Sequence, residues 1–496
     1  MQNNKISILF ITILTIILSV SCSEEEEFAY DNSTHLTFST DTVTFDTIFT
    51  SIGSATKRFK IYNKNKKGVR IESVRLGSGG NSGFRVNLDG VSNTQFSDVE
   101  IYHGDSIFCF VEVTIDPHDS DLPLLKSDSL IFTLPNGIVQ KIYLQAYGQD
   151  IIELRDEHIT TDMTLDSKRP YVIYNNLTVE EGATLTIQPG TTLCFHADAG
   201  LEVHGSLVAE GTPQQPITMR GDRTDKLLPY LPYDRTAGTW QGVKLHPESS
   251  GNKLTNCNIH GGKFGVMMLS DDKSQKSENR LYILNSIIHN VSGNALYIID
   301  GQATIHNSQI SNAKGYCAAI IGGNVEFSHC TLAQFYIWDE YLGALYFANH
   351  DGDDEYPLNQ LTFNNSIITG YRNDEIFGSQ LHDSDINFNY RFNNCLINTI
   401  LSEEDEPNFL ECVIDTINDS KRGKESYKDL AKSREGNFRS VDTNNFIYNF
   451  QLDTLSVARK MGDGKYTPSD CKTDLNGIER PENKPDVGCY QLNTID

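Results

Sequence analysis

The chain has 496 residues and a formal net charge of −25, so a phosphate polyanion would be repelled and nucleic acid is excluded as an expected partner. Its length allows two to four domains. Glycine is abundant, with 37 residues, and long apolar stripes with a helical period are absent. These features predict an all-β fold with many turns.

The N-terminus carries an uncharged apolar run from Ile6 to Leu18, preceded by Lys5. A helix of that length spans about 20 Å, which is shorter than the ~30 Å hydrocarbon core of a bilayer. We therefore predict a signal peptide over residues 1–22 rather than a membrane span.

Ser19 and Ser21 precede Cys22 at the end of this segment. The arrangement resembles the lipobox of bacterial lipoproteins, whose cysteine becomes the lipidated N-terminus, although Leu18 lies four residues before the cysteine instead of the usual three. The alternative is an ordinary signal peptide with an incidental cysteine.

An acidic linker over residues 23–33 follows the cysteine. It opens with a serine and four glutamates, namely Ser23, Glu24, Glu25, Glu26 and Glu27. This order resembles the export signal of certain Gram-negative surface lipoproteins, which implies an outer membrane lipoprotein that is exposed at the cell surface and held by its acyl chains. The alternative is a solvated acidic linker.

Residues 34–150 are predicted to form an antiparallel, immunoglobulin-like β-sandwich. About seven short segments alternate apolar and polar residues and are separated by turn clusters. Cys109 lies in one of these segments and is expected to be a small core residue. No catalytic constellation occurs here, so we expect a stalk or spacer.

Residues 155–440 are predicted to form a second domain, in which a short phrase recurs from residue 256 to residue 414: an asparagine precedes a serine or cysteine and then aliphatic residues. The serine or cysteine recurs at spacings of 29, 22, 22, 36, 29 and 17 residues, which indicates stacked coils with loops inserted in some of them. The asparagines are Asn256, Asn285, Asn307, Asn365 and Asn394, and looser copies begin at His329 and Glu411.

The alternation of inward residues breaks at each phrase. Ile283 and Ser286 are both expected to face inward but lie three residues apart, so the strand must bend between them. The bend falls at Asn285, and asparagine tolerates left-handed backbone geometry better than any residue except glycine. Stacked asparagines can also hydrogen-bond from coil to coil.

From residue 177 to residue 414 this pattern resembles the right-handed parallel β-helix proteins of the pectate-lyase-like superfamily. The fold implied by the whole chain is an immunoglobulin-like β-sandwich followed by a right-handed parallel β-helix with a C-terminal cap. Cys257, Cys330, Cys395 and Cys412 alternate with serines in the repeat, so we predict packed interior residues rather than disulfides or metal ligands.

The C-terminal segment, residues 441–496, resembles the ending of many exported bacterial β-helix proteins. The resemblance rests on Asp474, Gly477, Arg480, Pro481, Asp486, Val487, Gly488 and Tyr490. We predict that Arg480 pairs with Asp474 or Asp486 and that the segment caps an open sheet edge. A disulfide between Cys471 and Cys489 is an open alternative.

Galacturonan hydrolases of this fold carry Asn-Thr-Asp, Asp-Asp, Gly-His-Gly and Arg-Ile-Lys motifs. Only the Asp-Asp pair occurs here, at Asp271–Asp272 and Asp353–Asp354, in polar stretches that look like loops. We assign no catalytic residue. Neither Cys194 with His196 nor His329 with Cys330 has partners at zinc spacing.

Two inserted loops are the candidate binding sites. Their aromatic and charged residues could hold a sugar, or the acidic ones a calcium ion. The alternative is that the aromatic residues pack the loops and the acids are solvated. The first loop supplies Tyr336, Trp338, Tyr341, Asp351, Asp353 and Asp354, with Glu355 as a further calcium candidate, and the second supplies Arg223, Tyr230 and Tyr233.

The leading functional hypothesis is a non-catalytic binding or adhesion lipoprotein directed at a polysaccharide or host glycan. The rival is a polysaccharide lyase or glycoside hydrolase of β-helix type, and a third hypothesis is a structural component of the cell envelope. No cofactor is expected apart from the calcium candidate.

Overall fold

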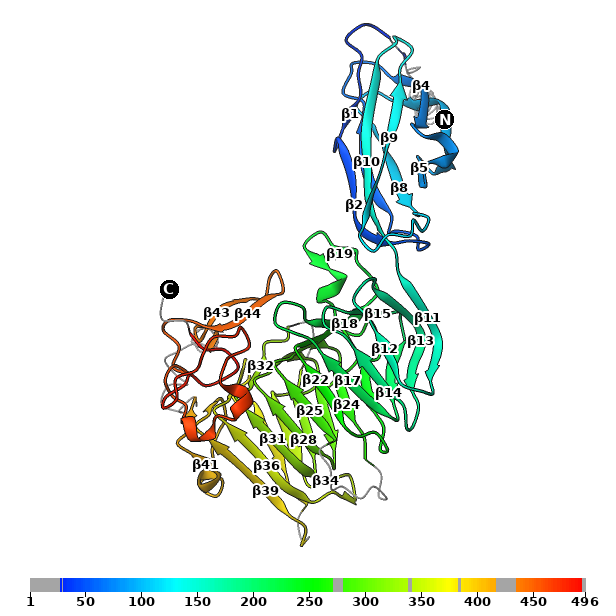
Figure 1. Ribbon diagram of the computed structural model, residues 1–496. Coiled ribbons are helices and arrows are strands. Elements are labelled where there is room, and N and C mark those ends of the chain that lie inside the picture. The colour runs from blue at the N-terminus through cyan, green and yellow to red at the C-terminus, as the bar shows by residue number, and fades with distance from the viewer. Residues whose placement is uncertain are drawn as a thin grey trace, which may run out of the picture. The chain divides into compact units, whose positions relative to one another are not determined.

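The computed structural model describes residues 27–28, 30–270, 280–337, 341–381, 385–415 and 434–492. The chain divides into two compact units, Met1–Gln149 and Asp150–Asp496 (Figure 1). Cys22, Ser23 and Glu24 to Glu26 lie outside the described residues, whereas Glu27 is described and pairs with Lys67 at 2.5 Å. Within the described ranges, no helix has the length and apolar character needed to cross a bilayer.

The first unit is a β-sandwich of two five-stranded sheets around one apolar core. Cys109 is fully buried in that core. One sheet contains, in order, β1 (Thr37–Phe38), β3 (Lys57–Tyr62), β8 (Ser106–Val113), β5 (Phe84–Leu88) and β6 (Val91–Asn93). The other contains β2 (Thr42–Phe49), β10 (Val139–Gln149), β9 (Leu124–Thr133), β4 (Val69–Leu76) and β7 (Gln95–Ile101).

The expectation of a purely antiparallel sandwich is wrong at one edge. Strand β2 runs parallel to β10, with a register shift between Gln145 and Tyr147. A parallel pair needs a long crossover connection, and here nearly the whole unit separates the two strands in sequence. Period-2 alternation reports burial but not strand direction, so the sequence alone could not reveal this pairing.

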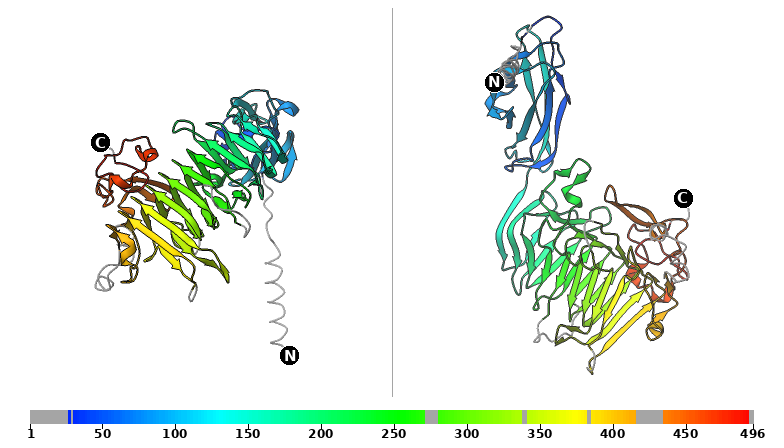
Figure 2. Two further views of the ribbon diagram at one scale, coloured as in Figure 1. Left: turned by 60° about the horizontal axis from the view of Figure 1, so that its bottom comes forward. Right: turned by 180° about the vertical axis from the view of Figure 1, so that it is seen from behind.

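The second unit is a parallel β-helix whose strands form three faces, and most coils contribute one strand to each face (Figures 1 and 2). The first face contains β12 (Met163–Leu165), β14 (Thr184–Ile187), β17 (Ser206–Glu210), β22 (Asn252–Thr255), β25 (Leu281–Leu284), β28 (Gln302–His306), β31 (Gly323–Ser328), β36 (Leu358–Asn364), β39 (Phe388–Asn393) and β41 (Phe409–Leu410).

The second and third faces share their earliest strands, β11 (Ile152–Ile159) and β13 (Tyr171–Val179). The second face then contains β15 (Thr192–Phe195), β18 (Ile217–Gly221), β23 (Cys257–His260), β26 (Ile287–Val291), β29 (Gln309–Ala313), β32 (Thr331–Gln334), β37 (Ile367–Gly370), β40 (Leu396–Ile397) and β42 (Val413–Ile414). The third contains β16 (Gly200–Val203), β21 (Val243–Leu245), β24 (Val266–Met268), β27 (Leu296–Ile299), β30 (Ala318–Ile321), β33 (Leu345–Ala348) and β38 (Ile376–Ser379).

The recurring phrase marks the corner between the first and second faces. Its leading residue has a left-handed backbone in all seven copies, with φ from 47° to 53°. These residues are Asn256, Asn285, His329, Asn307, Asn365, Asn394 and Glu411. Asparagine amides connect some neighbouring coils directly, as Asn307 Nδ2 donates to Asn285 Oδ1 at 2.6 Å.

The small residue after each corner faces inward and satisfies backbone groups left free by the bend. Ser286 Oγ accepts from the Cys257 amide at 3.1 Å and donates to the Leu284 carbonyl at 2.9 Å. The Cys330 thiol takes the same place and donates to the Ile305 carbonyl at 3.2 Å. Serine and cysteine alternate here because both are small and both carry a donor.

All nine described cysteines are free thiols, which include Cys471 and Cys489. Next to the small-residue ladder, four phenylalanines stack inside the rod on successive coils. Their ring centroids are 4.3, 5.2 and 4.6 Å apart along the series Phe327, Phe363, Phe392 and Phe409.

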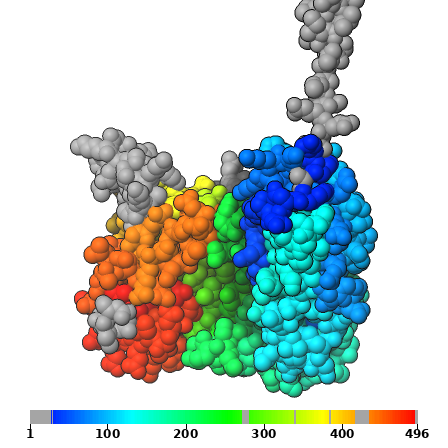
Figure 3. Space-filling model, turned by 90° about the horizontal axis from the view of Figure 1, so that it is seen from above, coloured from blue at the N-terminus to red at the C-terminus, as the bar shows by residue number. Residues whose placement is uncertain are grey.

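The C-terminal segment lies alongside the β-helix, where it covers the Asn corner and part of the second face. Figure 3 shows it as a continuous orange and red surface. Its elements are the hairpin β43 (Phe438–Asp442) and β44 (Ile447–Leu452) and two 3₁₀ turns, η4 (Gly464–Tyr466) and η5 (Ser469–Cys471). Side chains of this segment share a buried cluster with Phe335, Ile367 and Leu396 of the coils.

The predicted pairing of Arg480 with Asp474 or Asp486 is wrong. The guanidinium donates to Asn307 Oδ1 at 2.7 Å and to the carbonyls of Gly488 and Asp486. The two carboxylates instead accept backbone amides, as Asp474 does from Ile478 at 2.7 Å and Asp486 from Lys460 at 2.7 Å. Arg480 therefore joins the segment to the Asn corner.

Candidate functional site

A hollow of about 1140 Å³ lies at the opposite corner, where the chain passes from the second face to the third. The connections after β26, β29, β32 and β37 form its walls, and they contain four, four, ten and five residues respectively. The hollow is lined by Ser292, Gly293, Lys314, Gly315, Tyr341, Leu342, Arg372, Asn373, Asp374 and Phe377.

A strip of partly exposed aromatic rings adjoins this hollow on the outer side of the third face. Parallel pairing aligns Tyr346 with Phe377. Tyr316 stacks on Tyr346 with centroids 5.2 Å apart and contacts Phe377 at 6.1 Å. Tyrosine and phenylalanine rings offer flat apolar surfaces, and burial raises the pKa of the Tyr316 hydroxyl, which therefore remains a neutral donor.

Both signs of charge occur in the hollow. The Arg372 guanidinium lies 5.6 Å from the centre of the Phe377 ring and donates to the Tyr341 carbonyl at 3.0 Å. Asp374 accepts from the Thr399 hydroxyl at 2.7 Å. Asn373 Oδ1 is enclosed and has no hydrogen-bond partner among the described residues.

Glu375 fixes the wall of the hollow from behind. Its carboxyl accepts from the backbone amides of Arg372 at 2.7 Å and Ala344 at 2.9 Å, so it joins two coils. The residue is fully buried, and burial raises the pKa of the carboxyl to about 8. Because no face of it reaches solvent, Glu375 positions the lining residues and cannot touch a ligand.

The structure separates the residues predicted for the first loop. Tyr341 lines the hollow, but Tyr336 is only 7% exposed, and Trp338 lies outside the described residues. The acidic residues lie on a small hairpin formed by β34 (His350–Asp351) and β35 (Asp354–Glu355), and they are exposed. They comprise Asp351, Asp353, Asp354 and Glu355.

The second loop contains β19 (Lys226–Leu228), β20 (Leu231–Pro232) and η2 (Tyr233–Arg235). Arg223 lies 3.7 Å from the centre of the Tyr233 ring and binds both oxygens of Asp225, at 2.9 and 2.7 Å. These groups are therefore occupied within the loop, whereas Tyr230 is 53% exposed.

A polar cluster anchors this loop to the second face. Asp234 binds Arg220 at 2.9 Å and His260 at 2.8 Å. Burial of the Asp234 carboxyl acts to raise its pKa, but His260 and Arg220 outweigh that effect and lower the pKa to about 2. The depression beside the cluster has a volume of only about 10 Å³, so it has no room for a sugar.

Sequence reasoning missed most of the residues around the hollow. Lys314 follows β29, whereas Arg372, Asp374 and Phe377 belong to the coil of β37 and β38, so the lining comes from separate coils and forms no local motif. The outward position on the third-face strand could have indicated Phe377, whereas the other three residues lie on connections, where no periodic signal exists. Connections of unequal length hide that register in the sequence.

Comparison with known proteins agrees with the coil architecture. A family described as "Right handed beta helix region" matches residues 175–332. The Drosophila melanogaster protein bark beetle is 30% identical over 137 residues, which are 27% of this chain and 4% of that much longer protein.

Solved structures show distant likenesses. The catalytic domain of a GH87 alpha-1,3-glucanase is 8% identical with a TM-score of 0.23 and covers 74% of this chain and 91% of its own. Pectate lyase Pel9A is 12% identical with a TM-score of 0.23, over 69% and 88%. A PapD-like domain of human CEP192 is 11% identical with a TM-score of 0.17, over 26% and 96%.

Proposed function

We propose that the chain is a surface lipoprotein that binds a glycan in the hollow between the second and third faces without cleaving it. The observation that carries the proposal is the aromatic strip of Tyr316, Tyr346 and Phe377 beside a hollow of about 1140 Å³. Stacked rings next to polar side chains suit a sugar, which presents apolar C–H faces and hydroxyl edges.

The carboxyl groups support binding over hydrolysis. Hydrolysis of a glycosidic bond generally uses two carboxyl groups that flank the scissile bond. In the hollow, Asp374 is held by Thr399, and the neighbouring Glu375 is enclosed and bonded to backbone amides. Only one of the two carboxyl groups can therefore reach a ligand.

The matched test is binding to a glycan array by the wild type, Tyr346→Ala and Tyr230→Ala. Tyr230 is an exposed tyrosine outside the hollow and serves as the control. Stacking on one ring contributes roughly 0.5–1.5 kcal/mol beyond area burial, so Tyr346→Ala should weaken binding by roughly 2- to 13-fold or more. If both variants bind the glycan equally well, the hollow is not the glycan-binding site.

A lyase is the second candidate because Lys314 and Arg372 place basic groups in the hollow. Elimination requires a base for the proton next to the sugar carboxylate. Mass spectrometry of uronate polysaccharides after incubation distinguishes the two functions: new unsaturated ends support the lyase, and unchanged chains with retained binding support the binding protein.

The membrane anchor is proposed from Cys22 and the following Ser23 and glutamates. Metabolic labelling with a fatty acid should mark the wild type and not Cys22→Ala. Protease treatment of intact cells should digest the wild type, and replacement of Glu24 to Glu27 by alanine should protect it. Labelling that persists in Cys22→Ala would exclude lipidation at this residue.

A further inference from the structure

We propose that His306, Asp470 and Cys471 bind a zinc ion that fastens the C-terminal segment to the β-helix. Within the described residues, these three supply the set of ligand atoms that lie within 4.8 Å of one another. His306 ends β28 on the first face, and the other two residues belong to η5. An imidazole, a thiolate and a carboxylate are all established zinc ligands.

The distances are close to those of a metal site. His306 Nδ1 lies 3.0 and 2.9 Å from the two oxygens of Asp470. Ligand atoms around a tetrahedral zinc ion are roughly 3.3–3.8 Å from one another, as follows from bond lengths of about 2.0–2.3 Å. The carboxylate must therefore move away from the imidazole by only a few tenths of an ångström, and the thiol must come within bonding distance.

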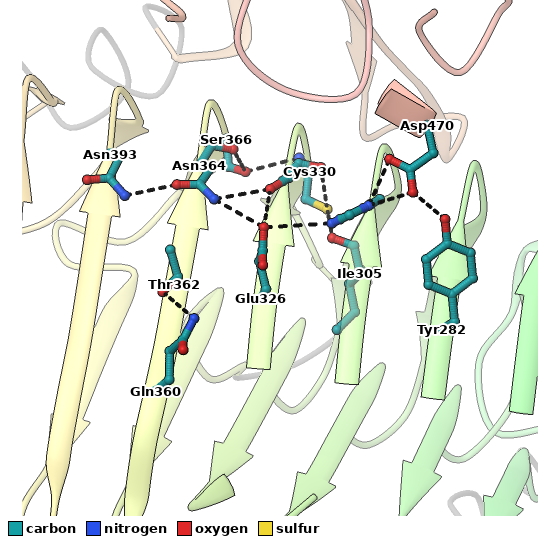
Figure 4. Close-up of polar contacts among 12 residues, drawn as sticks. Tyr282, Ile305, Glu326, Cys330, Gln360, Thr362, Asn364, Ser366, Asn393 and Asp470 are labelled. Atoms are coloured by element: carbon teal, nitrogen blue, oxygen red, sulfur yellow. Dashed lines mark hydrogen bonds and ion pairs between the residues drawn. The ribbon is translucent and has the colours of Figure 1, made fainter. Parts of the chain in front are cut away.

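The other ring nitrogen of His306 is placed as in known zinc sites. Nε2 is enclosed without a hydrogen bond and lies 3.8 Å from Glu326 Oε1. A metal-binding histidine typically directs its second nitrogen to a carboxylate, which fixes the ring and raises its basicity. Glu326 is itself held by Ser328 at 3.1 Å and Asn364 at 3.3 Å, and Figure 4 shows the latter contact.

The surroundings restrict solvent but leave an entry path. Cys471 is fully buried and His306 is 7% exposed, whereas the Asp470 side chain is 28% exposed. Tyr282 also donates to Asp470, so the carboxylate is oriented from the side opposite to η5 (Figure 4). A water molecule from the open side can complete the four ligands, and binding releases the thiol proton of Cys471 to solvent.

The nearby thiols provide a matched control. Cys330 occupies the small-residue ladder, where neighbouring coils carry serine, so Cys330→Ser should fold normally. Cys471→Ser and His306→Gln remove a ligand each. Glu326→Gln retains all three ligands and removes only the carboxylate beside Nε2.

The test uses the full chain after its signal peptide, freed of metal and titrated with Zn²⁺, with metal content measured by mass spectrometry. The wild type and Cys330→Ser should bind one equivalent, Cys471→Ser and His306→Gln should bind at least about 100-fold more weakly, and Glu326→Gln about 10- to 100-fold more weakly. Substitution by Co²⁺ should give a thiolate charge-transfer band that is absent in Cys471→Ser.

Two results would overturn the proposal. If the wild type takes up no zinc, the three residues form only a hydrogen-bonded ion pair between the segment and the coil. If Cys471→Ser binds zinc as tightly as the wild type and the cobalt band persists, the thiol is not a ligand. Circular dichroism of each variant shows whether a loss of metal reflects a loss of fold.

Discussion

Asn307→Ala should destabilise the β-helix much more than Asn256→Ala, another substitution in the Asn ladder. Asn307 is fully buried, with φ of 47°. Its side chain donates to Asn285 at 2.6 Å and to the Thr473 carbonyl at 3.1 Å, and it accepts from Arg480 at 2.7 Å. The substitution therefore breaks contacts with the neighbouring coil and with the C-terminal segment at once.

The magnitude follows from these contacts. Two neutral hydrogen bonds contribute about 1 kcal/mol each, and the bond to the buried guanidinium contributes about 1.5–3 kcal/mol. Alanine at a left-handed position costs about 1–2 kcal/mol more. The sum is about 4.5–7 kcal/mol for Asn307→Ala, and Asn307→Gly should lose less, about 3.5–5 kcal/mol, because glycine tolerates this backbone.

Native-state hydrogen exchange is the suitable assay, because stacked coils need not unfold as one unit. Amides of β28, β29 and residues 470–490 should lose protection together. Asn256→Ala is the control, since Asn256 has the same backbone conformation with φ of 48° but a single contact, to the Gly211 carbonyl at 3.1 Å. Equal losses in Asn307→Ala and Asn256→Ala would refute the reasoning.

Three further outcomes are expected. The folded pKa of Asp234 is about 2, below its ordinary value of 3.8. The ionised carboxylate therefore stabilises the fold above pH 3.8, and this contribution is lost as the pH falls toward 2. In Asp234→Asn, the urea midpoint should change less between pH 5 and pH 2.5 than it does in the wild type. Phe363→Ala should cost about 3–5 kcal/mol by equilibrium denaturation, because the ring is stacked between Phe327 and Phe392. Cys395→Ser should change the melting temperature little, and a fall of many degrees would contradict the equivalence of serine and cysteine in the ladder.

The coil architecture could be predicted because its constraints are local. A left-handed corner selects asparagine, and the inward position after it selects a small residue with a donor, so both leave marks at every repeat. The contact between Asn307 and Arg480 joins residues 173 positions apart, and nothing near either residue indicates it. The sequence pattern of the C-terminal segment predicted a cap on an open sheet edge, whereas the segment lies along the Asn corner of several coils.

Two of the three corners of the coil differ in the sequence variation that they tolerate, and this difference indicates where a binding site can form. The corner between the first and second faces keeps one backbone conformation in seven coils and is partly covered by the C-terminal segment. The corner between the second and third faces accepts connections of four to 21 residues, and the strands on either side remain in parallel register. Side chains on such connections can change at little cost to the core, as is usual for binding residues carried by a rigid scaffold. The Asn corner therefore maintains the rod, and the opposite corner is where a ligand preference can be built.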